Sequence, residues 1–158
     1  MATTTLPRGL RNNNPLNLRV SNNPWLGKVK NNTDGAFEQF TTIEYGYRAA
    51  FRNIRTIVQR RSAQNNTTTV RQLIHVWAPS SDGNNEAAYC QSIQKHSSIS
   101  PDELVIIKNK DFMCKLVYGM AVTENGQAVS RAQIDSAYNL AFGRPVPAPV
   151  VSHEEDRD

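Results

Sequence analysis

Cysteine, histidine and long apolar runs are all scarce in this chain of 158 residues. The three histidines and two cysteines lack the spacing of metal ligands, and the sequence has no glycine-rich phosphate loop and no serine-hydrolase elbow. Cys90 and Cys114 fall in helical patterns, which favours buried free thiols over a disulfide. No apolar run approaches the length of a membrane span. We therefore expect no metal and no cofactor, and either carboxylate chemistry or no chemistry.

The composition is that of one globular domain with a basic surface. Apolar residues make up 39% of the chain and charged residues 20%, and the formal net charge is +4. A positive charge favours an anionic partner, either a cell-wall polymer or a nucleic acid. We predict a single domain over residues 9–142, preceded by a disordered lead (1–8) and followed by a disordered, proline-spaced acidic tail (143–158).

Hydrophobic periodicity predicts a mainly α (α+β) fold with one small β-hairpin. Alternating residues in 16–20 and 36–40, separated by the turn signal Asp34-Gly35, indicate two short strands. Helical spacing follows over 42–60, 69–77, 85–96, 111–124 and 130–141, and Ser100-Pro101-Asp102-Glu103 has the pattern of a further helix start. Gly46 is typical of a helix that packs closely on a neighbour. Arg48, Arg52 and Arg55 lie opposite the apolar stripe, and we expect a solvated face.

One helix ends on an isolated carboxylate. Met113, Val117, Met120 and Ala121 share a helical face whose lower edge carries Glu124, and Gly126 suits the left-handed residue that closes the helix. Apolar surroundings and the negative end of the helix dipole both disfavour a charged Glu124. Both effects raise its pKa, as a general acid near neutral pH requires. The alternative is a surface carboxylate at a frayed helix end.

An ordered set of motifs resembles a known family. The motifs are Arg8-Gly9-Leu10-Arg11-Asn12-Asn13-Asn14-Pro15-Leu16-Asn17-Leu18-Arg19, Trp25-Leu26-Gly27, then Asp34, Phe37 and Phe40, Tyr45-Gly46-Tyr47-Arg48-Ala49, and Trp77-Ala78-Pro79 with Asn85 and Ala87-Ala88-Tyr89. The set resembles a phage and prophage family usually labelled virion structural protein, over about residues 8–141.

The same residues also resemble lysozyme-like peptidoglycan hydrolases. Val122-Thr123-Glu124-Asn125-Gly126 is similar to their helix ending on the catalytic Glu, residues 12–40 to their β region, and residues 77–89 to the tyrosine-bearing element of bacterial glucosaminidases. In that family the Glu helix precedes the β region, whereas here it follows. The resemblance therefore implies a circularly permuted lysozyme-like domain.

Three side chains are candidates for the chemistry beside Glu124. Asp34 is a possible second carboxylate, although Asp-Gly is more often a turn that bonds its own backbone. Glu38, which alternates with Phe37, ranks below it and is assigned to substrate binding. Tyr89 lies on an apolar helical stripe, where a tyrosine is more often a residue of the hydrophobic core. The glucosaminidase resemblance implies instead a tyrosine against the reacting sugar.

The remaining substrate-binding candidates lie mainly in the first forty residues. Trp25, between Pro24 and Gly27, is a better sugar platform than Trp77, which closes an amphipathic helix and is expected in the core. Phe37 and Phe40 cannot share one strand face, so either the strand bulges or one ring faces a cleft. The amides of the asparagine run could bind N-acetyl groups or fix the β region against the Glu helix. The full substrate-binding set is Trp25, Asn13, Asn14, Asn17, Glu38, Phe40 and Asn125.

The resemblances imply cleavage of peptidoglycan glycan strands, by hydrolysis or by transglycosylation, with Glu124 as the acid. The first alternative is a non-catalytic virion or injection-apparatus protein that binds other virion or secretion-apparatus proteins. The hypothesis of a DNA-binding protein rests only on the positive charge, because no recognised nucleic-acid motif is present. Residues 1–17 lack the apolar stretch of a secretory signal. We expect synthesis in the bacterial cytoplasm and delivery to the wall by a virion, a holin or a secretion system.

Overall fold

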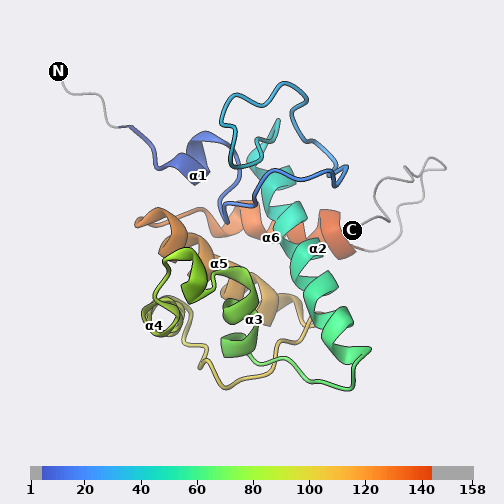
Figure 1. Cartoon of the computed structure of the whole chain (residues 1–158), viewed down its shortest axis with the longest axis vertical. Helices are drawn as coiled ribbons and strands as arrows, with labels where there is room; N and C mark the ends of the chain where they lie inside the picture. Colours follow the sequence, from blue (N-terminus) through green and yellow to red (C-terminus); the bar gives the residue numbers. More distant parts are fainter. Residues whose placement is uncertain (1–4, 144–158) are drawn as a thin grey trace.

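Six α-helices and one 3-10 helix form within residues 5–143, the part of the chain that this computed structural model describes (Figure 1). Their bounds are α1 Arg8–Arg11, α2 Ile43–Ser62, α3 Val70–Trp77, the 3-10 helix η1 Ser80–Asp82, α4 Glu86–Ser97, α5 Lys110–Asn125 and α6 Arg131–Phe142. The mainly α prediction is thus confirmed. The expected disordered lead and tail fall largely outside the described residues, although Arg8, which we assigned to the lead, begins α1.

Side-chain caps explain where the long helices begin. The side chains of Thr42, Thr69 and Ser130 accept backbone N–H groups at the starts of α2, α3 and α6, as the sequence predicted. Asn85 and Asn109 cap α4 and α5 in the same way. Each cap satisfies an N–H that has no partner inside its helix, and this fixes the register in which the apolar stripes face inward.

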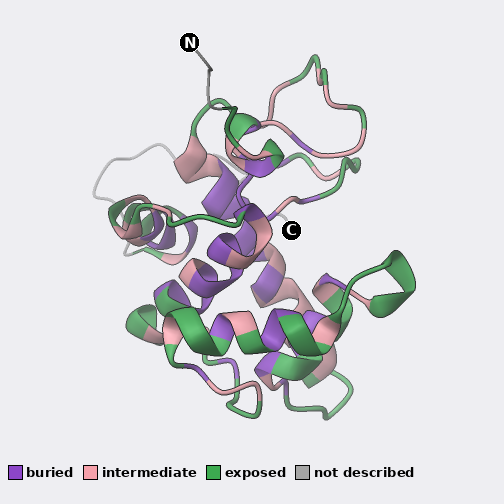
Figure 2. Cartoon of the chain, turned by 90° about the vertical axis from the view of Figure 1, so that its left-hand side faces the viewer, coloured by how far each residue is buried: buried purple, intermediate pink, exposed green. Residues whose placement is uncertain are grey.

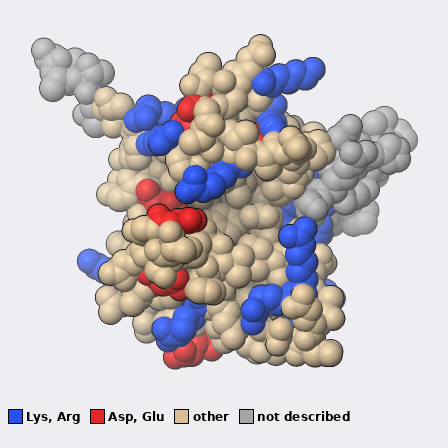
Figure 3. Space-filling view, viewed as in Figure 1, with Lys and Arg blue, Asp and Glu red and all other residues tan. Residues whose placement is uncertain are grey.

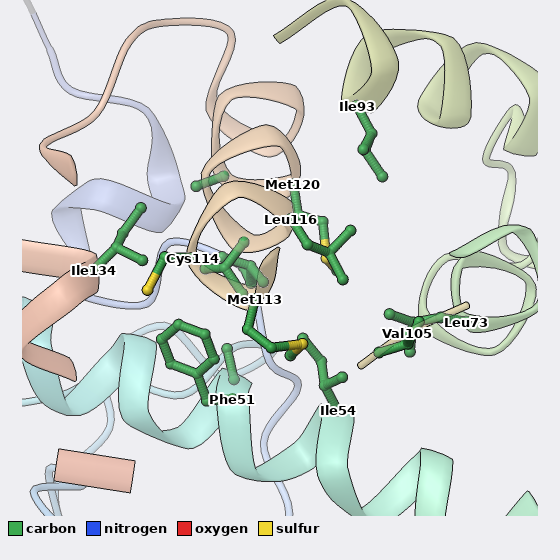
Figure 4. Packing of buried hydrophobic residues seen from close by; sticks show 14 of the residues in the cluster. Phe51, Ile54, Leu73, Ile93, Val105, Met113, Cys114, Leu116, Met120 and Ile134 are labelled. Atoms are coloured by element: carbon green, nitrogen blue, oxygen red, sulfur yellow. The ribbon is translucent and has the colours of Figure 1, made fainter. Parts of the chain in front are cut away.

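The core surrounds α5. This helix packs mainly on α4 and α6, while α2 packs on α6 from the other side. Figure 4 shows side chains of α2, α4, α5 and α6 meeting, among them Phe51, Ile93, Met113 and Ile134, all fully buried. The predicted stripe of α5 is part of this cluster. Both cysteines are buried and free, as expected.

The predicted helix start at residues 100–103 is wrong. The Ser100 N–H donates to the Glu103 carboxylate and the Asp102 N–H donates to the Ser100 hydroxyl, as in a capped helix. The chain then extends, and Thr69 and Leu104 form an antiparallel bridge. The residues that follow, Val105, Ile106 and Ile107, are β-branched and therefore disfavour helix. This segment instead covers the start of α3, where the Val70 N–H donates to the Glu103 carbonyl.

The N-terminal segment approaches a hairpin without forming a strand among the described residues. Single antiparallel bridges join Arg19 to Phe37 and Lys28 to Phe40. A regular ladder does not extend because a side chain takes its place: the Asn14 amide nitrogen donates to the Leu18 and Glu38 carbonyls, and its oxygen accepts the Leu18 N–H. In Figure 1 this segment forms the looped lobe above the helices.

The arginine face of α2 is not solvated, contrary to expectation. Arg48 is 1% exposed and Arg52 is 6% exposed, and α2 packs closely on α6. Arg52 donates to the Ala141 carbonyl over 2.9 Å, and the Arg55 guanidinium lies 5.3 Å from the centre of the Phe142 ring. The guanidinium groups therefore bind the C-terminal end of α6, where a positive charge is favourable.

A second, smaller cluster attaches the N-terminal segment to α2. It consists of Leu18, Trp25, Phe40 and Ala49. Gly46 contributes by its small size, because a Cβ there would collide with the Asn13 carbonyl. Figure 2 shows the resulting burial, with the inner faces of the helices covered and their outer faces exposed.

Across the described residues, the helices are too short or too polar to span a membrane.

Candidate active site around Glu124

The last turn of α5 carries a carboxylate followed by a buried amide. Gly126 closes the helix in the left-handed conformation, with φ 68°, and its N–H donates to the Val122 carbonyl over 2.8 Å. Glu124 is therefore one residue before the buried Asn125 at the end of an apolar helix. The predicted position of both residues on the helix is confirmed.

Two side chains from distant parts of the chain donate to Glu124. The Tyr89 hydroxyl on α4 donates to Oε2 over 2.8 Å, and the Asn17 side-chain nitrogen donates to Oε1 over 2.9 Å. Each carboxylate oxygen thus has one neutral donor. The structure brings together three of the residues chosen from the sequence: a carboxylate, a phenol and an amide.

Burial sets the protonation behaviour of this group. Desolvation raises the pKa of Glu124, and the hydrogen bonds from Asn17 and Tyr89 partly offset the rise. Burial, and then the charge of Glu124, raise the pKa of Tyr89 well above its usual value, so its hydroxyl stays protonated and remains a donor. A carboxyl group with a raised pKa and fixed donors to its charged form is suited to give a proton and to take one back.

The asparagine run is mostly structural. Asn14 replaces ladder bonds as described above, the Asn13 side chain donates to the Phe40 carbonyl over 3.0 Å, and the Asn12 side chain donates to Asp34 over 2.9 Å. Asn125 donates to the Pro15 and Ala121 carbonyls. The contacts of Asn12, Asn13 and Asn14 lie within the N-terminal segment, whereas Asn125 and Asn17 connect that segment to α5.

Asp34 organises a turn, and its hydrogen bonds within the described residues do not involve Glu124. Its carboxylate accepts from the Arg8 guanidinium at 2.6 and 2.8 Å, from the Asn12 side chain, and from the Ala36 and Phe37 N–H groups. The Arg8 hydrogen bonds, followed by that of Asn12, hold the pKa of Asp34 far below its usual range. Such a carboxylate stays ionised, and its lone pairs are occupied by structural donors.

Glu38 is a buried structural acid. Its side chain is fully buried and forms an ion pair with Lys28 over 2.9 Å, while its Oε2 accepts the Ser21 N–H over 3.1 Å. These contacts cross-link the N-terminal segment. None of them reaches the Tyr89, Asn17 and Glu124 group.

The two tryptophans are arranged the other way round from the expectation. Trp25 is 7% exposed and packs with Phe40 in the smaller cluster, so neither ring presents a face to solvent. Trp77, expected in the core, is only partly buried and lies between the two clusters. The loop around Trp25 folds inward because Ala49 on α2 offers an apolar surface for it.

A groove of about 310 Å³ runs beside the carboxylate's turn of α5. Ser92 and His96 of α4 line it together with Tyr118, Thr123 and Gly126, and its lining does not include Glu124, Tyr89 or Asn17. Figure 3 shows one face of the molecule, where Lys and Arg side chains are spread out and interspersed with acids. Among the described residues no group of His, Cys, Asp and Glu side chains could hold a metal ion.

Sequence reasoning missed the part that Arg8 plays. Its guanidinium pairs with Asp34 and lies 4.6 Å from the centre of the Phe37 ring, so the expected lead contributes to the fold. The signal was the position of Arg8 at the start of the Arg8–Arg19 motif, whose other members are ordered. Its partner could not be deduced, because 26 residues separate Arg8 from Asp34.

Comparison with known proteins supports a phage relationship. The chain is 34% identical over 82 residues to Protein P5 of Pseudoalteromonas phage PM2, an alignment that covers 50% of this chain and 49% of that protein. The chain therefore aligns with about half the length of this curated relative. No protein-family model matches the sequence.

Proposed function

We propose that this phage-related protein cleaves the glycan strands of peptidoglycan, with Glu124 as general acid. The observation that carries the proposal is the carboxyl group at the end of α5, whose pKa burial raises and whose two oxygens accept from Tyr89 and Asn17. Neutral Glu124 protonates the glycosidic oxygen as the bond to the anomeric carbon breaks. The hydroxyl of Tyr89 and the amide of Asn17 then stabilise the carboxylate that forms.

The second half of the reaction needs a nucleophile and a base. The Glu124 carboxylate accepts a proton from water, which gives hydrolysis, or from the sugar's own hydroxyl, which gives an anhydro product. The contacts of Asp34 favour a route with one acid, because structural donors occupy its carboxylate, and Glu38 is bound within the N-terminal segment through its Oε2. We assign Tyr89 to positioning Glu124, because its hydroxyl donates to the carboxylate.

The fold that we propose for this activity is a circularly permuted lysozyme-like domain. In support, a helix ends on the acid, a loop-rich segment with antiparallel bridges packs beside it, and a tyrosine from another helix reaches the carboxylate. The segment precedes the acid helix in the chain, as the permutation requires. The net positive charge of +4 would favour adsorption to anionic wall polymers.

A zymogram of purified protein tests the proposal. Glu124→Gln keeps the shape of the side chain and removes the proton that is transferred, so we expect it to clear no cell wall. Glu103→Gln, an equal change of charge at an exposed acid, should clear like the wild type. Circular dichroism confirms that both variants are folded. Equal clearing by wild type and Glu124→Gln would refute the role of Glu124.

The alternative function is a non-catalytic virion or injection-apparatus protein, for which the similarity to a phage protein is the supporting observation. It predicts stable association with particle components and no release of muropeptides by wild type. DNA binding has less support, because Arg48 and Arg52 are buried, and Arg52 binds the Ala141 carbonyl rather than being presented to a phosphate backbone.

A further inference from the structure

Asn125 connects the end of α5 to the loop that carries Asn17. Its side-chain nitrogen donates over 2.8 Å to the Ala121 carbonyl within the helix and over 2.8 Å to the Pro15 carbonyl outside it. The residue is 7% exposed, so neither bond competes freely with water. One side chain thus binds α5 to a loop residue two positions before Asn17.

The loop is shaped so that this bond determines where Asn17 lies. Asn17 adopts a left-handed backbone conformation with φ 53°, and its N–H donates to the Asn14 carbonyl over 3.0 Å. The turn from Asn14 to Asn17 is therefore closed on itself, and Pro15 within it has a fixed φ. Moving the Pro15 carbonyl away from α5 would move Asn17 with it.

Gly9 completes the arrangement from the opposite side. A Cβ on Gly9 would lie 2.8 Å from Asn125 Oδ1, 2.9 Å from the Asn14 carbonyl and 3.0 Å from Asn17 Oδ1. The two side-chain oxygens are both buried without a hydrogen-bond partner, and both point at this one place. Their nitrogens are therefore directed the other way, toward Pro15 and toward Glu124.

We propose that Asn125 is a positioning residue for Glu124: by binding the Asn14–Asn17 turn to α5, it holds the Asn17 amide against the carboxylate. The inference rests on the proposed function for its catalytic meaning, but the positioning itself is a property of the protein without substrate. Among the described residues the titratable group that hydrogen-bonds Glu124 is Tyr89, from α4, and its hydroxyl stays protonated. The direction of a change in the pKa of Glu124 therefore identifies its cause, because loss of the Asn17 donor raises this pKa whereas entry of water lowers it.

The test follows the carboxyl ¹³C signal of Glu124 in the full chain as pH is varied. The hydrogen bond from Asn17 lowers the pKa of Glu124, so Asn17→Ala should raise it. Asn125→Ala should raise it in the same way although its side chain bonds Pro15 and Ala121 rather than Glu124, and the double variant should add nothing further. Asn139→Ala, an asparagine near the end of α6, should leave the titration unchanged. We also expect kcat/KM on cell walls to fall by about tenfold in Asn125→Ala.

A milder variant covers the case in which Asn125→Ala does not fold. Asn125→Ser keeps a hydroxyl that bonds the Ala121 carbonyl one turn back but is too short to reach Pro15 as well, and the same rise is expected. An unchanged Glu124 titration in a folded Asn125 variant would overturn the inference. A changed titration in a protein that cleaves no glycan would uphold the positioning and refute the proposed function.

Discussion

Tyr89 on α4 and Glu124 on α5 are joined by a hydrogen bond of 2.8 Å across 35 positions of sequence. The bond links the two helices whose packing forms much of the core, and it ends on the oxygen of an acid whose pKa is raised by burial. Loss of the Tyr89 hydroxyl should therefore change both the stability of the protein and the pKa of Glu124.

Tyr89→Phe removes this donor and leaves the ring in place. We expect a loss of about 1 kcal/mol in the free energy of unfolding, as for one hydrogen bond, and a higher pKa of Glu124. Tyr138→Phe is the matched control, because Tyr138 has the same 8% exposure and donates over 2.8 Å to the Ile107 carbonyl. It should cost similar stability in urea unfolding and leave the titration of Glu124 unaltered. A shift of equal size in both variants would contradict a specific role for Tyr89.

The free energy of unfolding should depend on pH in the way expected for a buried acid with a raised pKa. Because the pKa of Glu124 in the folded chain lies above 4.5, the unfolded chain loses its proton first as pH rises, and this destabilises the folded state. The unfolding free energy of wild type relative to Glu124→Gln should therefore be highest below pH 4.5 and fall as pH rises through the folded pKa.

Asp111→Asn provides a control of opposite sign for that measurement. Hydrogen bonding to Lys115 and then Arg131 lowers the pKa of Asp111, so wild type should gain stability relative to this variant as pH rises. Denaturant unfolding at a series of pH values measures both differences. Parallel pH dependences for the two variants would contradict the raised pKa of Glu124.

Gly46→Ala tests the contact between α2 and the asparagine run. Alanine normally stabilises a helix interior relative to glycine. Here the added methyl group would collide with the Asn13 carbonyl, so we expect a loss of about 2 kcal/mol. Gly35→Ala separates steric from backbone effects, because its Cβ would meet open space while φ is 85°. It should cost about 1 kcal/mol in thermal or urea unfolding. A stabilised Gly46→Ala would show that the segment does not pack as described.

Asp34→Asn distinguishes a turn former from a second catalytic carboxylate. The change removes the charge that five donor groups surround, so the melting temperature should fall. Assayed well below that temperature, the variant should retain most of its wall-clearing rate. Abolished clearing with an unchanged melting temperature would instead make Asp34 part of the chemistry.

Local signals predicted the helices well because each has a local cause. Thr42, Thr69 and Ser130 bond N–H groups three residues away, and the apolar face of α5 follows from periodicity alone. At Ser100 the same local signal failed for two reasons. The residues after Glu103 are β-branched, and the N–H groups at the start of α3 bond the carbonyls of this segment, which holds it extended. Capping residues fix the first turn of a helix, whereas elongation of the helix depends on the residues that follow.

The candidate site was predictable only in part. Glu124 was found from its place at the end of an apolar face, Tyr89 was chosen from family resemblance, and Asn17 was assigned to substrate binding rather than to Glu124. That they donate to opposite oxygens of one carboxylate depends on how α4 and the N-terminal segment pack on α5. The burial of Trp25 against Ala49 and of Arg52 against the end of α6 depends likewise on tertiary packing, which periodicity does not encode.

The most direct test of a catalytic Glu124 is mass spectrometry of purified peptidoglycan incubated with wild type and with Glu124→Gln. We predict that wild type releases muropeptides whose masses and end groups identify the bond cut and the nucleophile used, and that Glu124→Gln releases none. Intact glycan strands after incubation with folded wild type, or identical fragments from both proteins, would contradict the account.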